Sequence, residues 1–313
     1  MGKIAFVFPG QGAQYSGMGR EAVEGCPAAA AVFDEGSAAL GFDLRELVFN
    51  GTEESLKITE NTQPAIVAAS LACMQPLLEA GIRPNMAAGL SLGEYCAHVA
   101  AGTLSAGEAI SLVRERGKLM QEAVPAGVGT MAAILGLSDE QVLEVCTAAS
   151  AAGIVEPANF NCPGQIVIAG EVAAVEEACV LAKEAGAKRA MILAVSAPFH
   201  CSMLRPAGVK LAASLEKITL HDMAIPVVAN VTGMFIASTA DVKDLLVRQV
   251  SSPVRWEDCV RTLIDAGTDT FVEIGPGKVL NGFIRKIDRN VAVYNADNQA
   301  SIDETIAALK GRS

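Results

Sequence analysis

One serine, Ser91, stands in a setting typical of a nucleophile. Residues 89–93 read Gly-Leu-Ser-Leu-Gly and lie between an apolar run and a helical pattern. This order fits G-x-S-x-G, in which the serine occupies a tight strand-to-helix turn and the glycines let the backbone approach closely. The helix would present free N–H groups and its positive dipole end near the hydroxyl, which favours an oxyanion. We predict a nucleophile; the alternative is that Ser91 only caps the helix and the glycines serve packing.

A serine nucleophile needs a base, and the chain has only three histidines. His98 lies seven residues after Ser91 in the same expected helix, about 10 Å along its axis, which is too far to reach the hydroxyl. His221 sits beside Asp222 ahead of an apolar run, as a surface-loop histidine would. His200 follows a strand-like run and a proline, at a junction where a rigid support displays catalytic groups. We predict that His200 is the base; the alternative is a buried histidine that caps a helix.

An arginine falls on the apolar face of a predicted helix. Ser105 and Glu108 form a capping box that opens this helix, and Arg116 then lies in the stripe of apolar residues spaced three or four apart. A guanidinium there must find an anion. The anion is either an internal carboxylate or the carboxylate of a substrate, which the planar fork of arginine would hold with two hydrogen bonds. The residues themselves leave this choice open.

Alternating strand-like and helical segments predict the elements that position these residues. The alternation indicates an α/β-hydrolase-like body with a largely parallel sheet, whose ligands bind at the carboxyl ends of the strands. From residue 126 the order becomes βαββαβ, which is typical of a ferredoxin-like unit. We therefore expect a body formed by residues 1–125 and 196–313, with a ferredoxin-like subdomain inserted at 126–195. The strands of the body are expected at 3–8, 86–90, 225–230, 270–275 and 291–296.

Composition narrows the class of protein. The 313 residues are 51% hydrophobic, enough for a large core, and carry a net charge of −11, which argues against nucleic acid or an anionic membrane as partner. We identify no apolar run long enough to span a membrane and no signal peptide, so we expect a cytoplasmic protein. The eight cysteines are scattered without C-x-x-C pairs or neighbouring histidine clusters, which predicts reduced thiols and no metal site.

With these residues assembled, the sequence resembles the malonyl-CoA:acyl-carrier-protein transacylase family, the acyltransferases of bacterial type II fatty acid synthesis. The resemblance spans nearly the whole chain and depends on seven motifs in order, which are far more specific together than any one alone. They are FPGQGAQYSGMG at 8–19, NTQPAI at 61–66, GLSLGEY at 89–95, RGKLMQ at 116–121, PFH at 198–200, VANVTG at 228–233 and EIGPGKVL at 273–280.

The resemblance implies roles for the residues already singled out. Ser91 would be the nucleophile and His200 its base. The backbone N–H groups of Gln11 and Leu92 would form the oxyanion hole. Arg116 would bind the malonyl carboxylate.

Three further residues, and one departure, follow from the same resemblance. The backbone carbonyl of Gln249 would orient the histidine, so that its side chain would matter little. Asn161 would line the cleft between insert and body, and Phe199 would narrow the pocket beside the substrate's α-carbon, which predicts a preference for malonyl groups. Many relatives read GHSLG, whereas this chain has Leu90 in place of that histidine, so any role for a histidine there is absent.

The implied reaction moves malonyl from malonyl-CoA to the phosphopantetheine thiol of holo acyl carrier protein through a malonyl-serine. No metal or resident cofactor is expected, because CoA and phosphopantetheine arrive as parts of the substrates. We expect a monomer. An acidic carrier protein would need a locally basic surface, for which one candidate is Lys278, Arg285, Lys286 and Arg289; an ordinary solvated helix face is the alternative.

Two rival functions remain. An α/β-hydrolase esterase shares G-x-S-x-G, but such enzymes place an acid and then the histidine after the serine and carry an HGGG-type loop, which this chain lacks. A catalytically silent module that binds carrier protein would keep the fold without covalent acylation.

Overall fold

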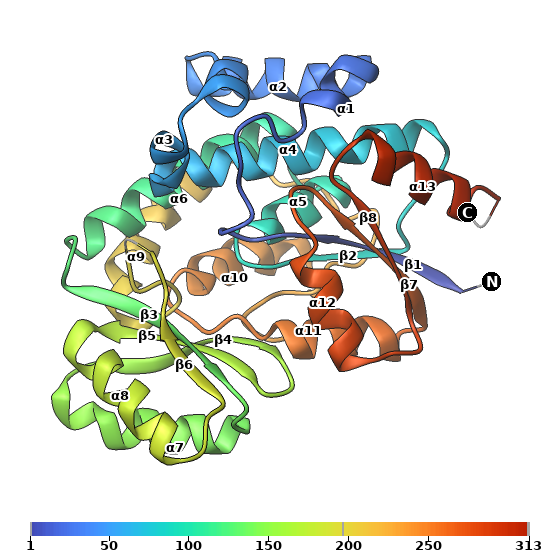
Figure 1. The fold of residues 1–313 in the computed structure, drawn as a ribbon. Helices are drawn as coiled ribbons and strands as arrows, with labels where there is room; N and C mark the ends of the chain where they lie inside the picture. The colour runs from blue at the N-terminus through green and yellow to red at the C-terminus, as the bar shows by residue number, and fades with distance from the viewer. Residues whose placement is uncertain (1, 196, 312–313) are drawn as a thin grey trace.

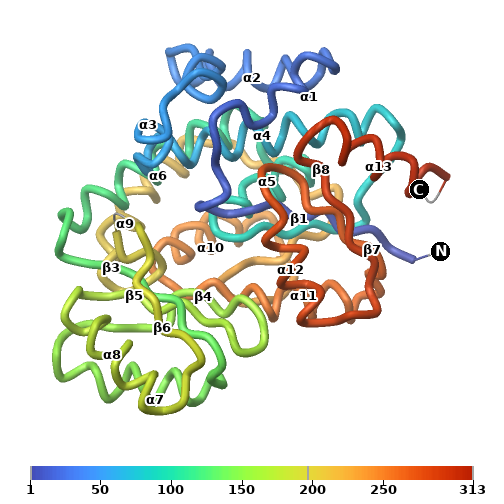
Figure 2. Tube along the Cα trace, viewed as in Figure 1, coloured from blue at the N-terminus to red at the C-terminus, as the bar shows by residue number. Residues whose placement is uncertain are grey.

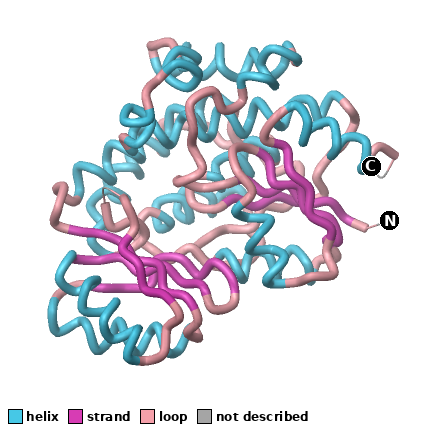
Figure 3. The backbone as a smooth tube through the Cα atoms, viewed as in Figure 1, coloured by secondary structure: helices cyan, strands magenta, loops and turns pink. Residues whose placement is uncertain are grey.

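Two β-sheets organise the protein. The computed structural model describes residues 2–195 and 197–311, and Figure 3 shows its strands gathered in two separate groups. The larger group is a parallel sheet in the order β2-β1-β7-β8. Its strands are β1 (Lys3–Phe8), β2 (Met86–Gly89), β7 (Thr268–Ile274) and β8 (Ala292–Ala296).

Helices cover both faces of the parallel sheet (Figure 1). Successive side chains of β1 point to opposite faces: Phe6 and Phe8 join the core beneath α4 and α5, whereas Ala5 and Val7 join the core beside α11 and α12. This double burial explains why the strand is apolar from Ile4 to Phe8. The helices of the body are α1 (Arg20–Gly25), α2 (Pro27–Leu40), α3 (Glu53–Lys57), α4 (Thr59–Glu79), α5 (Gly93–Ala100), α6 (Ala106–Ala123), α9 (Arg205–Leu215), α10 (Val242–Gln249), α11 (Trp256–Asp265), α12 (Val279–Ile287) and α13 (Gln299–Leu309).

The second sheet is antiparallel, in the order β4-β5-β3-β6. In Figure 2 the chain passes through it in green and yellow and returns to the body at α9. One face packs on two helices, and the other contributes Met131 and Val167 to the core shared with the body. This is the βαββαβ arrangement expected from the sequence, and all of its elements lie within residues 126–195. They are β3 (Gly129–Leu135), α7 (Asp139–Ala149), β4 (Val155–Cys162), β5 (Gln165–Glu171), α8 (Val172–Glu184) and β6 (Arg189–Ile192).

The prediction of a strand at 225–230 is wrong. Only two isolated pairings form there, Ala87 with Val227 and Val228 with Phe235. Pro226 has no N–H to donate to a ladder, and the chain turns back after Val228. The turn frees Asn230 to reach the residues around Ser91, as described below. No helix among residues 2–195 and 197–311 has the length and apolar character needed to cross a membrane.

Candidate active site

The Ser91 turn is a close-packed, strained backbone segment at the carboxyl end of β2. Ser91 has a φ of 56°, in the left-handed region that non-glycine residues rarely adopt. A Cβ on Gly89 would lie 1.9 Å from the carbonyl carbon of Gly93, and a Cβ on Gly93 would lie 2.3 Å from the carbonyl oxygen of Phe8. Both glycines are therefore required by close backbone approach, as G-x-S-x-G predicts.

His200 lies beside Ser91 at this turn. Its φ is 60°, and among the described residues these two are the only non-glycine residues with a positive φ, a kind of strain that clusters at functional sites. The Oγ of Ser91 lies 2.7 Å from Nε2 of His200, and Nδ1 of His200 lies 2.8 Å from the backbone oxygen of Gln249. Because a carbonyl only accepts, Nδ1 carries the proton and the neutral ring offers Nε2 as a base to the hydroxyl.

The surroundings keep this histidine neutral. Burial, followed by the nearby positive charge of Arg116, lowers the pKa of His200 to about 3. The other two histidines do not reach the site. His98 is fully buried in α5, where burial lowers its pKa to about 4. His221 is exposed in a loop, and its backbone N–H donates to the carbonyl of Thr103.

Arg116 is held beside the serine by neutral groups. The capping box predicted at the start of α6 is present, and Arg116 is only 1% exposed. Its Nη1 donates to Oε1 of Gln63 at 2.8 Å, and its Nη2 donates to Oγ of Ser91 and to Oε1 of Gln249, each at 3.0 Å. Within the described part of the chain no carboxylate forms an ion pair with it. The internal carboxylate left open as its partner is therefore not found there.

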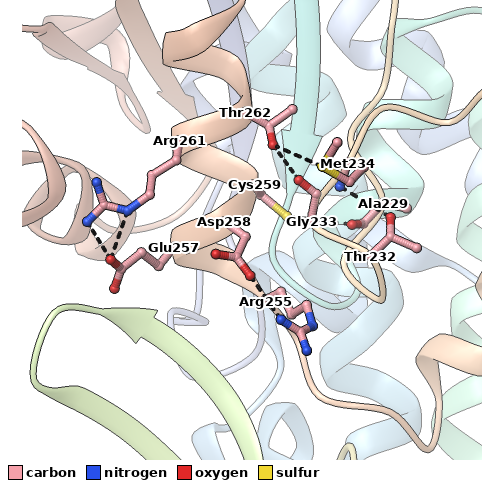
Figure 4. A network of polar contacts seen from close by, with 10 residues as sticks. All are labelled: Ala229, Thr232, Gly233, Met234, Arg255, Glu257, Asp258, Cys259, Arg261 and Thr262. Carbon is pink, nitrogen blue, oxygen red and sulfur yellow. Dashed lines mark hydrogen bonds and ion pairs between the residues drawn. The ribbon is translucent and has the colours of Figure 1, made fainter. Parts of the chain in front are cut away.

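The side chain of Asn230 holds the backbone of the Ser91 turn in place through two hydrogen bonds. Its Oδ1 accepts the N–H of Ser91 at 2.7 Å, and its Nδ2 donates to the carbonyl of Gly89, also at 2.7 Å. The loop that carries it is tied to α11, as Figure 4 shows: the hydroxyl of Thr262 donates to the carbonyl of Gly233, and the thiol of Cys259 to that of Ala229. The strained serine is thus supported from a second layer of structure.

Three of the remaining predicted residues line a cavity of about 540 Å³ between the two sheets. Gln11, Phe199 and Asn161 all line it with Ser91 and Arg116, and Met131 and Val167 contribute apolar wall from the second sheet. Gln11 follows β1, and the N–H of Leu90 bonds the carbonyl of Phe8 at 2.9 Å, which brings the turns after β1 and β2 together. Leu92 is buried directly after the serine, at the start of α5.

Comparisons with known proteins agree with this geometry. A family model described as an acyl transferase domain matches residues 5–302. The malonyl CoA-acyl carrier protein transacylase of Bacillus subtilis is 47% identical over 311 residues, which cover 99% of this chain and 98% of that protein. This chain belongs to the acyl transferase family.

Solved structures of acyl transferases have the same fold. The malonyl CoA-acyl carrier protein transacylase of Clostridium perfringens gives a TM-score of 0.96 at 45% identity, covering 99% of this chain and 98% of that one. A type II polyketide-synthase acyl-carrier protein in complex with its malonyl-transacylase gives 0.94 at 44% identity, covering 98% of this chain and 99% of the transacylase. The resemblance drawn from seven motifs is confirmed.

Several residues of this acyl transferase site were not assigned by sequence reasoning. Gln63, Glu94 and Asn230 each lie inside a motif that carries the resemblance, so the motifs marked their positions without giving a role. The side chain of Gln249, expected to matter little, is fully buried and hydrogen-bonds Arg116, Glu94 and the carbonyl of Ser91. Sequence spacing gave no sign of these contacts, because they join segments far apart in the chain.

Proposed function

We propose that this acyl transferase moves a malonyl group from malonyl-CoA to the phosphopantetheine thiol of acyl carrier protein, through an ester on Ser91. The observation that carries the proposal is the buried guanidinium of Arg116, whose Nη2 lies 3.0 Å from Oγ of Ser91. Among the described residues no carboxylate forms an ion pair with it. A malonyl thioester is the acyl donor whose far carboxylate suits that charge. Family membership and the names of the relatives support the same reaction.

In the first half-reaction Ser91 attacks the thioester. As Oγ bonds the carbonyl carbon, its proton passes to Nε2 of His200, 2.7 Å away. The backbone N–H groups of Gln11 and Leu92 stabilise the tetrahedral oxyanion, an effect typically worth ~10²–10³ in rate per donor. The carbon–sulfur bond then breaks, and CoA leaves as a thiol with the proton that His200 returns.

In the second half-reaction the phosphopantetheine thiol is the nucleophile. His200 accepts its proton while the sulfur attacks the ester carbon, and Ser91 leaves with that proton. The acyl group is held by the enzyme between two substrates, which makes the kinetics ping-pong. No metal or resident cofactor takes part in this scheme, since CoA and phosphopantetheine belong to the substrates.

Selection of the acyl group is assigned to the walls of the cavity. Arg116 binds the malonyl carboxylate and so aligns the thioester carbonyl with Ser91. Phe199, which lines the cavity next to His200, leaves little space beside the α-carbon and disfavours branched groups. Asn161 faces the same space from β4 and contributes a polar contact to the substrate.

The carrier protein docks on the basic residues of α12 and its flanks. Lys278, Arg285, Lys286 and Arg289 are all exposed, and Leu280 and Phe283 of α12 line the cavity. Reversing the charge of Lys286 should raise the KM for carrier protein, most strongly at low salt, whereas Lys310→Glu on the exposed end of α13 should not. An unchanged KM in the Lys286 variant across a salt series would remove this surface.

The setting of the enzyme follows the same reasoning. We assign a monomeric, cytoplasmic enzyme that binds neither nucleic acid nor membrane. The body is residues 1–125 and 196–313, and the ferredoxin-like subdomain at 126–195 forms one wall of the cleft.

The decisive experiment is intact-protein mass spectrometry after brief incubation with malonyl-CoA, acetyl-CoA or methylmalonyl-CoA. The expected result is one malonyl adduct on the wild type, absent from Ser91→Ala and discharged by a pantetheine thiol. Release of free CoA without an adduct or thiol acceptor would indicate a hydrolase. Binding of carrier protein with neither adduct nor CoA release would indicate a silent module.

A further inference from the structure

The most unusual charge near the site belongs to Glu94. It lies three residues after Ser91, in the first turn of α5, with no exposed surface. Among the described residues no cation forms an ion pair with it. A buried carboxylate without a cation must be compensated by hydrogen bonds, because desolvation of the charge is costly. One oxygen, Oε2, makes both of its bonds, accepting from the N–H of Asn230 at 3.0 Å and from Nε2 of Gln249 at 2.7 Å.

The bond to Gln249 fixes the direction of that amide. Oε2 accepts from the N–H of Asn230, and a proton bound by this carboxyl would lie on Oε1, which has no described partner. Oε2 is therefore an acceptor in both protonation states, and the NH₂ end of the amide must face it. The same Nε2 donates to the carbonyl of Ser91 at 3.0 Å, and Oε1 is left to accept from Arg116. The reverse orientation would set an oxygen against two acceptors and an NH₂ group against a guanidinium. Residue Gln249 also supplies the backbone carbonyl that holds Nδ1 of His200.

The bond to Asn230 supports the nucleophile. It holds the backbone of the residue whose side chain bonds the N–H of Ser91 and the carbonyl of Gly89. One oxygen atom is therefore hydrogen-bonded to the two residues that restrain the serine and the histidine. A helix-dipole role in the first turn of α5 explains a carboxylate at this position, but does not require either of these two bonds.

We infer that Glu94 is a positioning residue, whose carboxylate aligns Gln249 and Asn230 so that His200 and Ser91 keep their reactive geometry. The inference depends on the proposed transfer reaction. Glu94 touches neither the substrate carbonyl nor the reacting oxygen in this assignment. It acts through the amides, and its loss should lower the rate of chemistry more than the binding of substrate.

Two substitutions separate positioning from stability. Glu94→Leu has a similar size and no acceptor, whereas Glu94→Gln keeps one oxygen able to accept both bonds. The rate constant for acylation by malonyl-CoA should fall about 10- to 100-fold in Glu94→Leu, the scale of a hydrogen bond to a charged group, with KM changed less than about threefold. Glu94→Gln should recover most of the rate even if its thermal stability is lower, since its NH₂ group has no described partner.

A proton NMR measurement gives a readout independent of turnover. The Nδ1–H of His200, bonded to the carbonyl of Gln249, should give a low-field resonance in the wild type and Glu94→Gln, and a broadened or missing one in Glu94→Leu. Glu273→Gln is the matched control, because Glu273 is the other buried carboxylate among the described residues and likewise accepts two hydrogen bonds, from the N–H groups of Leu280 and Asn281. It should alter stability and leave the resonance in place.

Gln249→Leu keeps the carboxylate and removes its donor. It should reproduce the loss of rate and resonance, and it carries the test alone if Glu94→Leu does not fold. The double variant should lose less rate than the product of the two single losses, because both changes break the bond between Glu94 and Gln249. Folded Glu94→Leu or Gln249→Leu protein with the wild-type rate and resonance overturns the inference. Absence of any Ser91 adduct in the wild type would instead overturn the proposed function.

Discussion

Arginine 116 offers the sharpest separation between the proposed reaction and its rivals. In Arg116→Ala the malonyl carboxylate would lose a two-bond partner in a buried site. Hydrogen bonds to charged groups contribute about 1.5–3 kcal/mol each, so the loss of two is about 3–6 kcal/mol. At about 1.4 kcal/mol per tenfold change, kcat/KM for malonyl transfer should fall by roughly 10²–10⁴ beyond any general loss.

The general loss is measured with acetyl-CoA. Arg116→Ala also strips Gln63, Gln249 and Ser91 of a donor, and this structural damage acts on both acyl groups equally. The malonyl-to-acetyl ratio of kcat/KM, taken from single-turnover acylation, therefore isolates the carboxylate contact. Arg114→Ala is the matched control, since Arg114 lies on the outer side of the same helix against Asn61 and Phe42. Equal losses for both acyl groups would refute a carboxylate-binding role.

Three other predictions concern titration and backbone packing. The low pKa of His200 should keep kcat/KM for acylation constant between about pH 5 and about pH 8. In Arg116→Ala the fall of kcat/KM in acid should begin at a higher pH, because the positive charge that lowers the pKa of His200 is gone. A fall of the wild-type kcat/KM near the ordinary pKa of histidine, about 6.5, would contradict this. Gly93→Ala should destabilise the protein by several kcal/mol in urea denaturation, on the order of other severe core clashes. The control Gly282→Ala, which has open space around the new Cβ, should stabilise the protein by about 0.5–1 kcal/mol. Similar changes in the free energy of unfolding for both variants would contradict the argument that Gly93 is required by close backbone approach. Burial raises the pKa of Glu94 to about 7, so the folded protein binds a proton that the unfolded chain has released, and the free energy of unfolding falls as pH rises from about 4.5 to about 7. Glu94→Gln should show a shallower fall in the free energy of unfolding over this range. An unchanged slope would argue against the raised pKa of Glu94.

The sequence predicted those features of the fold and site that depend on residues close together in the chain. The spacing of Gly89 and Gly93 around Ser91 identified the turn, because close backbone approach excludes any side chain there. The position of Arg116 within an apolar stripe identified a buried charge, and β-α alternation identified both sheets. These features depend on neighbours within a few turns of chain, which a sequence displays directly.

The remaining features depend on distant partners. A strand was predicted at 225–230 from its apolar residues, yet the chain turns there and sends Asn230 to the carbonyl of Gly89, 141 positions away. The side chain of Gln249 is separated from Glu94 by 155 positions. Propensity and periodicity contain no term for such contacts, so the orientation of these amides had to come from the structure.

The choice of neutral partners around Arg116 has a chemical reason. A carboxylate bonded directly to the guanidinium would have to be displaced by each incoming substrate, and the displaced charge would be left buried without a partner. Gln63 and Gln249 instead satisfy the guanidinium with amide oxygens, which hold its position while leaving its charge unneutralised by direct contact. Glu94 lies one amide further away, bonded to Nε2 of Gln249. Its charge moderates the buried arginine through the intervening amide without occupying the place that the malonyl carboxylate needs.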